Sequence, residues 1–148
     1  MSPTNNYLDR LTKGAENKTS AFSLNDPGTN NRVLINPTRV CQKIRVDGNL
    51  TEIKPERCDW CIRDPRRGEC LFVELKGHHW TDAVKQIGYT ICWFNQHITP
   101  FSVFKECYVI MRSSIPSNST AIQQAKIRFA RKYKSQLQMR HPGITIDF

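Results

Sequence analysis

Three residues near the middle of the chain have the side-chain chemistry to act together on a phosphate ester: Asp59, Glu74 and Lys76. Glu74 and Lys76 interrupt the stretch CLFVELKG, which otherwise has the composition of a buried strand. Side chains two positions apart in a strand share a face, so these two project together. A neighbouring strand in the right register would set Asp59 beside Glu74, and two carboxylates that close repel unless a cation lies between them.

Magnesium suits such a pair, because it takes one or two carboxylates, keeps several waters and accepts phosphate oxygens. A lysine ammonium alongside can orient an attacking water or neutralise charge that develops on the phosphate. The chemistry that these residues predict is hydrolysis of a phosphodiester. The alternative is an ordinary ion pair on a solvent-facing strand, since a glutamate and a lysine two residues apart are a common pattern.

The hydrophobic pattern predicts the elements that position these residues. Apolar positions alternate in some segments and recur with helical period in others, with Gly, Pro and Asn between them. The expected order begins with a short helix over residues 5–17 and an irregular connection over 20–37. Three strands follow: the first ends near Val46, the second is ERCDWCIRD and the third is CLFVELKG. The remaining elements are a helix over 81–95, a strand at ECYVIMRSS, a helix from 117–119 to about Met139, and a strand at GITIDF.

A strand meander followed by alternating helices and strands predicts an α/β fold. The sheet is expected to be mixed and flanked by helices, because parallel strands need a helical crossover. The 148 residues fit a single domain, 1–148, of which residues 1–37 are partly irregular.

The spacing of these residues resembles that of the PD-(D/E)XK, or restriction-endonuclease-like, nuclease superfamily. Asp59 is followed by fourteen residues and then by Glu74-Leu75-Lys76 at the end of an apolar strand, and the next helix carries Gln86. The resemblance implies that Asp59 and Glu74 bind Mg²⁺ or Mn²⁺, with the Leu75 carbonyl as a third ligand. It also implies that Lys76 acts on the attacking water and that Gln86 supports the site.

This resemblance covers about residues 40–112, and the order of elements along the whole chain fits the αβββαβ core that it implies. Cys58 stands where the motif's name has proline. The family's first helix often supplies a further glutamate, for which only Glu16 is available here. His78, at the mouth of the expected site, is a further candidate for contacting phosphate or moving a proton. A chain this small is expected to form a homodimer when it cuts two strands.

The charge of the chain favours a polyanionic partner. Lys and Arg number 22 against 13 Asp and Glu, a formal net charge of +9, which is typical of a protein that binds nucleic acid. For the nuclease expected from the resemblance, DNA is favoured over RNA as the substrate. A solvated surface is the alternative interpretation of the same charges. Basic residues of the last predicted helix, in a stretch without acids, are expected to hold the nucleic-acid backbone: Lys126, Arg128, Arg131 and Lys134.

Two other functions compete with a metal-dependent nuclease. One is a nucleic-acid-binding or regulatory protein on the same fold without catalysis. The other is a zinc-stabilised module that uses Cys58, Cys61 and Cys70 with Cys41 or His78, although strand residues three apart point to opposite faces.

The sequence shows no apolar run near the roughly 20 residues that a membrane span needs, and its N-terminal segment lacks the apolar stretch of an export signal. We therefore expect a cytoplasmic protein without a membrane partner.

Overall fold

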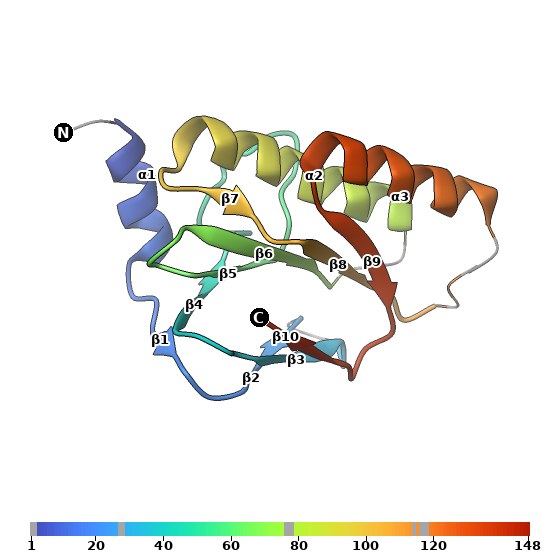
Figure 1. The fold of residues 1–148 in the computed structure, drawn as a ribbon, viewed down its shortest axis with the longest axis horizontal. Helices are drawn as coiled ribbons and strands as arrows, with labels where there is room; N and C mark the ends of the chain where they lie inside the picture. The colour runs from blue at the N-terminus through green and yellow to red at the C-terminus, as the bar shows by residue number, and fades with distance from the viewer. Residues whose placement is uncertain (1–2, 27–28, 76–78, 114, 116–118) are drawn as a thin grey trace.

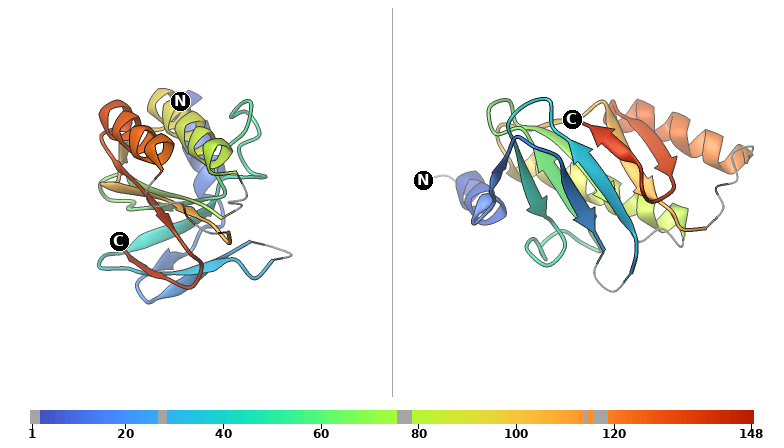
Figure 2. Two further views of the ribbon diagram at one scale, coloured as in Figure 1. Left: turned by 90° about the vertical axis from the view of Figure 1, so that its right-hand side faces the viewer. Right: turned by 90° about the horizontal axis from the view of Figure 1, so that it is seen from below.

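The computed structural model describes residues 3–26, 29–75, 79–113, 115 and 119–148. This part of the chain forms three layers: a layer of helices, a main mixed sheet, and a small second sheet (Figures 1 and 2). The predicted α/β class, with a mixed sheet, is confirmed.

The strands of the main sheet are β1 (Asn17–Lys18), β4 (Cys41–Arg45), β5 (Trp60–Arg63), β6 (Glu69–Glu74), β7 (Ser102–Val103), β8 (Glu106–Ile110) and β9 (Gln136–Arg140). They lie in the order β1-β4-β5-β6-β8-β9, with β7 paired beside β6. The β4, β5 and β6 strands form the predicted antiparallel meander, whereas β8 runs parallel to β6 and β9 parallel to β8.

The three described helices pack on the same face of this sheet, as the left view of Figure 2 shows. They are α1 (Pro3–Thr12), α2 (Trp80–His97) and α3 (Thr120–Tyr133). Leu11 of α1, Ile87 of α2 and Phe129 of α3 share one buried apolar cluster with Phe72 of β6. In the described part of the chain, the sheet is therefore flanked by helices on one face only.

The second sheet covers the other face and corrects the prediction for residues 20–37. The composition of this segment predicts an irregular connection, but it forms the hairpin of β2 (Phe22–Asn25) and β3 (Arg32–Asn36), which β10 (Thr145–Asp147) joins in parallel to β3. Burial alternates along β3, so its inner side chains pack against Leu71 and Val73 of β6. The many turn-forming residues of the segment conceal these two short strands in the sequence.

The last helix ends earlier than the sequence predicts. The expected end is Met139, but the helix stops at Tyr133, and Lys134 takes a left-handed conformation with φ of 58°. The following residues form β9, where Leu137 and Met139 face inward with a period of two. Leu137 fits the apolar face of a longer helix as well as that of a strand, which explains the wrong boundary.

The turn between β5 and β6 is held by Asp64 and Gly68. The Asp64 Oδ1 atom accepts the backbone N–H groups of Arg66 at 2.8 Å and Arg67 at 3.3 Å. Gly68 has a φ of +73°, and a Cβ atom there would collide with the backbone carbonyl of Pro100. This turn sets the β5–β6 register, in which Trp60 pairs with Val73.

Replacing Gly68 by alanine should destabilise the fold more than the same change at Gly14. Both glycines have nearly the same positive φ, +73° and +74°, but a Cβ atom at Gly14 meets nothing within 4 Å. Gly14→Ala should cost about 1–2 kcal/mol of unfolding free energy for the left-handed backbone. Gly68→Ala should cost about 1–3 kcal/mol more for the collision. Urea denaturation measures both, and equal losses would contradict this account of the turn.

The Asp64 carboxyl should make stability depend on pH. Burial alone would raise its pKa, but the backbone N–H groups of Arg66 and Arg67 and the guanidinium of Arg39 outweigh burial and lower it. A lowered folded-state pKa gives stability that is present above the unfolded value near 3.9 and lost as pH falls through the folded one. Asp64→Asn should therefore be less stable than wild type at pH 7, by about 1–3 kcal/mol. The difference in stability between wild type and Asp64→Asn should shrink below about pH 4. Urea denaturation at several pH values measures it, and a difference that stays constant with pH would contradict this role of the Asp64 carboxyl.

Candidate active site

Asp59 and Glu74 lie opposite each other across the β5–β6 pair. Because Trp60 pairs with Val73, the next position outward sets Asp59 against Glu74. The backbone N–H of Asp59 donates a hydrogen bond of 3.1 Å to Oε1 of Glu74, and the backbone N–H of Leu75 donates one of 2.9 Å to Oδ2 of Asp59. Each carboxylate is thus oriented by the backbone of the other strand, and the structure brings the two acidic groups together.

Both carboxylates are removed from solvent: Asp59 is 7% exposed and Glu74 is 1% exposed. Burying two acidic groups side by side is costly unless positive charge lies close to them. Carboxylate oxygens are the ligands that Mg²⁺ and similar hard cations prefer, so the pair has donor chemistry that suits a divalent cation.

Lys76 and His78 lie outside the described residues. Next to Lys76, the Leu75 carbonyl accepts a hydrogen bond of 2.6 Å from Nδ2 of Asn31, at the end of the turn between β2 and β3. The Leu75 oxygen is therefore directed toward that hairpin, with one of its two lone pairs used. Asn31 is 3% exposed, and within the described part of the chain its Oδ1 has no hydrogen-bond partner.

Helix α2 is attached to the start of β5 through Thr90. The Thr90 hydroxyl accepts the backbone N–H of Cys58 at 2.9 Å and donates to the Gln86 carbonyl at 2.8 Å. The Gln86 side chain itself donates to Oε2 of Glu56 at 2.7 Å. Gln86 thus lies one helical turn from the residue that anchors the Asp59 segment, and its amide binds the loop before β5. Glu56 also lines a cavity of about 330 Å³ with Pro55, Asp82, Lys85 and Tyr89.

Sequence reasoning missed Asn31 and Thr90. Asn31 falls in the stretch whose composition predicts irregular structure, and nothing local marks it as buried. Thr90 carries a weak signal, because a hydroxyl in the apolar stripe of a helix needs a hydrogen-bond partner when it is buried.

Glu16 is not brought to the carboxylate pair. It follows the end of α1 at Thr12 and precedes β1, which β4 and β5 separate from β6. Its carboxylate binds Lys18 at 2.7 Å, and the hydrogen bond and charge of this lysine lower the pKa of Glu16.

No family model, curated protein or solved structure matches this chain. None of the described helices is long and apolar enough to cross a membrane.

The cysteines do not assemble the zinc site considered from the sequence. Cys58 precedes β5 and packs with Cys61 and Cys70 on the helix side, which corrects the expectation that Cys58 and Cys61 face apart, whereas Cys41 packs on the side of the second sheet. Burial, and then the charge of Glu74, raise the pKa of the Cys58 thiol, and burial raises that of Cys61. Within the described residues, no three His, Cys, Asp or Glu side chains are grouped to hold a metal.

The basic residues expected to hold nucleic acid lie on and after α3. Arg128 and Arg131 are exposed on the helix, Lys126 is half-buried, and Lys134 is exposed at the left-handed position that ends it. Arg128 also lines a cavity of about 270 Å³ between α2 and α3, which the basic residues Lys85 and Lys132 line as well.

The interlocked hydrogen bonds predict different effects for alanine and amide substitutions. Asp59→Ala removes the acceptor for the Leu75 N–H, so it should lower the free energy of unfolding by about 1–3 kcal/mol. Asp59→Asn keeps an oxygen in that place and should lose less. The same contrast is expected for Glu74→Ala against Glu74→Gln, with urea denaturation as the measurement. Equal losses in the alanine and amide variants would show that these hydrogen bonds do not hold the strands together.

Proposed function

We propose that this chain is a metal-dependent nuclease that hydrolyses phosphodiester bonds in nucleic acid, with DNA favoured over RNA. The observation that carries the proposal is the pairing of Asp59 and Glu74, two buried acidic residues on neighbouring strands whose carboxylates each accept a backbone N–H from the other segment. Burying two acidic groups costs solvation free energy, and the electrostatic attraction of a bound cation would offset that cost.

The donor set fits Mg²⁺ or Mn²⁺. Asp59 and Glu74 offer hard carboxylate oxygens, and these ions complete their coordination with waters and substrate phosphate oxygens. The Leu75 carbonyl is the weaker third candidate, because Asn31 already donates to it. When bound, the ion would supply a Lewis acid and a more acidic water at the phosphate.

The residues around the pair have separate tasks in this proposal. Lys76, two positions after Glu74, brings an ammonium that can hold a water or balance charge on the phosphate. Asn31 positions the Leu75 peptide, and Thr90 positions the segment that contains Asp59. The Gln86 amide binds Glu56 in the loop before β5, and the Gln86 carbonyl accepts the Thr90 hydroxyl, so Gln86 acts as a supporting residue.

In this proposal the central part of the chain is a restriction-endonuclease-like core. Helix α1, the β4–β6 meander, α2 and β8 occur along the chain in the αβββαβ order that the sequence resemblance implies, although β1, β2 and β3 stand between α1 and β4, and β7 stands between α2 and β8. The elements additional to that order are β1, the second sheet, β7, α3 and β9. A homodimer that cuts two strands, and a nucleic-acid backbone held by α3, belong to the same proposal.

The direct test is an incubation of the chain with single-stranded, duplex and branched DNA and with RNA, in Mg²⁺, Mn²⁺ or EDTA. Wild type should cut at least one substrate in the presence of metal only. Asp59→Asn and Glu74→Gln should fold and should lose about 100-fold or more of the cleavage rate, because a lost metal ligand is worth several kcal/mol. Lys76→Ala should also cut more slowly.

Glu52→Gln is the matched control, since Glu52 binds Arg10 and does not belong to the carboxylate pair. It should cut as fast as wild type, which also excludes a contaminating nuclease as the source of the difference. Absence of metal-dependent cleavage on every substrate, or equal cleavage by Glu74→Gln, would reject the proposal. Salt-sensitive binding without cleavage, unchanged in Asp59→Asn and Lys76→Ala, would favour the binding protein without catalysis.

A further inference from the structure

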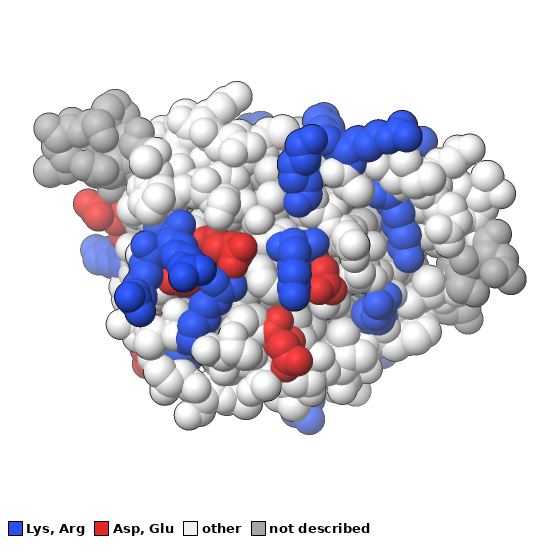
Figure 3. All heavy atoms as spheres, in the orientation of Figure 1, with Lys and Arg blue, Asp and Glu red and all other residues white. Residues whose placement is uncertain are grey.

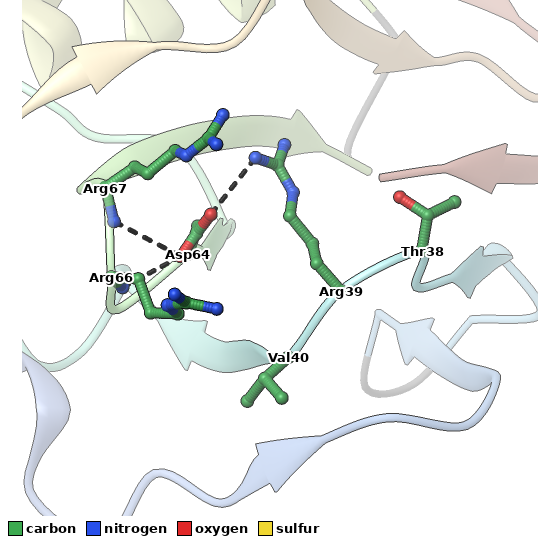
Figure 4. Close-up of a pocket in the computed structure, with 6 residues that line it drawn as sticks. All are labelled: Thr38, Arg39, Val40, Asp64, Arg66 and Arg67. Atoms are coloured by element: carbon green, nitrogen blue, oxygen red, sulfur yellow. Dashed lines mark hydrogen bonds and ion pairs between the residues drawn. The ribbon is translucent and has the colours of Figure 1, made fainter.

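A pocket of about 500 Å³ lies at the opposite end of the β5–β6 hairpin from the carboxylate pair. We call it the arginine pocket; it is lined by Thr38, Arg39, Val40, Asp64, Arg66 and Arg67 (Figure 4). Asp59 comes directly before β5 and Asp64 directly after it. At about 3.3 Å per residue along a strand, the two acids are roughly 17 Å apart. The arginine pocket is therefore separate from the candidate active site.

The carboxylate of Asp64 is already bound by donors within and beside the turn. Its Oδ1 atom accepts the backbone N–H groups of Arg66 and Arg67, and its Oδ2 atom accepts Nη1 of Arg39 at 3.1 Å. Asp64 is 4% exposed. It therefore fixes the peptide backbone from which two arginines project and holds the side chain of a third.

Arg39 is held rigidly in the pocket. Its guanidinium binds both Asp64 and Glu69, and it lies 4.1 Å from the centre of the Phe148 ring. Within the described residues its Nε is buried without a hydrogen-bond partner. An arginine fixed in this way loses little side-chain entropy when it meets a ligand.

Arg66 and Arg67 supply the excess positive charge. Both are exposed, and in the described part of the chain neither guanidinium has a hydrogen bond or an ion pair, because Asp64 and Glu69 both bind Arg39. Figure 4 shows that the arginines come from two segments and surround Asp64. In Figure 3, Lys and Arg side chains gather around acidic ones at the end of the molecule where the β5–β6 turn lies in Figure 1.

We propose that the arginine pocket binds a phosphate group of a nucleic-acid strand, away from the position where the strand is cut. Arginine suits this ligand, because its planar fork of N–H donors matches two phosphate oxygens. That the phosphate belongs to a nucleic-acid strand rests on the proposed function. That the pocket prefers a phosphate group rests on its arginine side chains. The excess of basic over acidic residues in the whole chain favours a polyanion over a free small anion.

The test measures binding in EDTA, so that it does not depend on cleavage. Fluorescence anisotropy with a labelled oligonucleotide gives the dissociation constant at several salt concentrations. Arg66→Ala/Arg67→Ala should weaken binding at least about 10-fold. The salt slope, which is the change in the logarithm of the binding constant with the logarithm of the salt concentration, should become smaller by about 1 to 2. This corresponds to a change close to one for each phosphate that no longer meets a cationic side chain. Arg66→Lys/Arg67→Lys keeps the charge and should recover the salt slope but only part of the affinity, because a lysine is a point charge.

The matched control is Lys13→Ala against Arg67→Ala, since each removes one exposed positive charge and Lys13 does not line the pocket. Lys13→Ala should bind like wild type. Equal effects of these two single variants, an unchanged salt slope in the double alanine variant, or no binding of any oligonucleotide would overturn the arginine pocket as a phosphate site. Binding that depends on Arg66 and Arg67 in a chain that cuts nothing would support the pocket and reject only the nuclease.

A second arm distinguishes the source of the phosphate. The same strand is compared with a 5′-phosphate and with a 5′-hydroxyl end. Tighter binding of the phosphorylated strand, lost in Arg66→Ala/Arg67→Ala, would assign the pocket to the strand terminus. Equal affinities that are both reduced in the variant would assign it to an internal phosphodiester. Competition by inorganic pyrophosphate against wild type but not against the variant would add direct support for either form.

Discussion

The reciprocal hydrogen bonds between the start of β5 and the end of β6 are the interactions on which the candidate site depends. The Asp59 carboxylate accepts from the backbone after Glu74, and the Glu74 carboxylate accepts from the backbone of Asp59. A shift of one residue between the strands would turn every side chain of one strand to its other face and separate the two acids. The Asp64 turn and Gly68, at the far end of the hairpin, prevent that shift.

Burial of β6 on both faces strengthens this constraint. Phe72 packs against the helices, while Leu71 and Val73 pack against the second sheet, so either face resists a change of register. It also places Glu74, which is 1% exposed, at the end of a strand that is buried on both faces. Electrostatic interactions are stronger in a buried environment than at the surface. A cation or a phosphate near Asp59 and Glu74 would therefore interact strongly with their charges.

The predictable part of the site is the part that depends on neighbours in the chain. The short turn between β5 and β6 makes their register nearly a local property, and this is why Asp59 and Glu74 can be paired from spacing alone. Asn31 is out of reach, because its hydrogen bond to Leu75 joins residues far apart in the sequence. The end of α3 fails for another reason: Leu137 satisfies both helical and strand periodicity, and only tertiary packing decides between them.

The parallel pairing of β10 with β3 has a consequence for how the molecule is made. Leu34 pairs with Thr145, more than a hundred residues later, so the second sheet cannot be completed until nearly the whole described chain has been synthesised. Until then, Leu71 and Val73 of β6 lack the apolar contacts that the last segment of the chain provides. A ribosome adds about 5–20 residues per second, so this state lasts for seconds during synthesis. Exposed apolar surface of this kind promotes aggregation, so a chain that ends before residue 145 should aggregate more readily than the full chain rather than form a smaller stable domain.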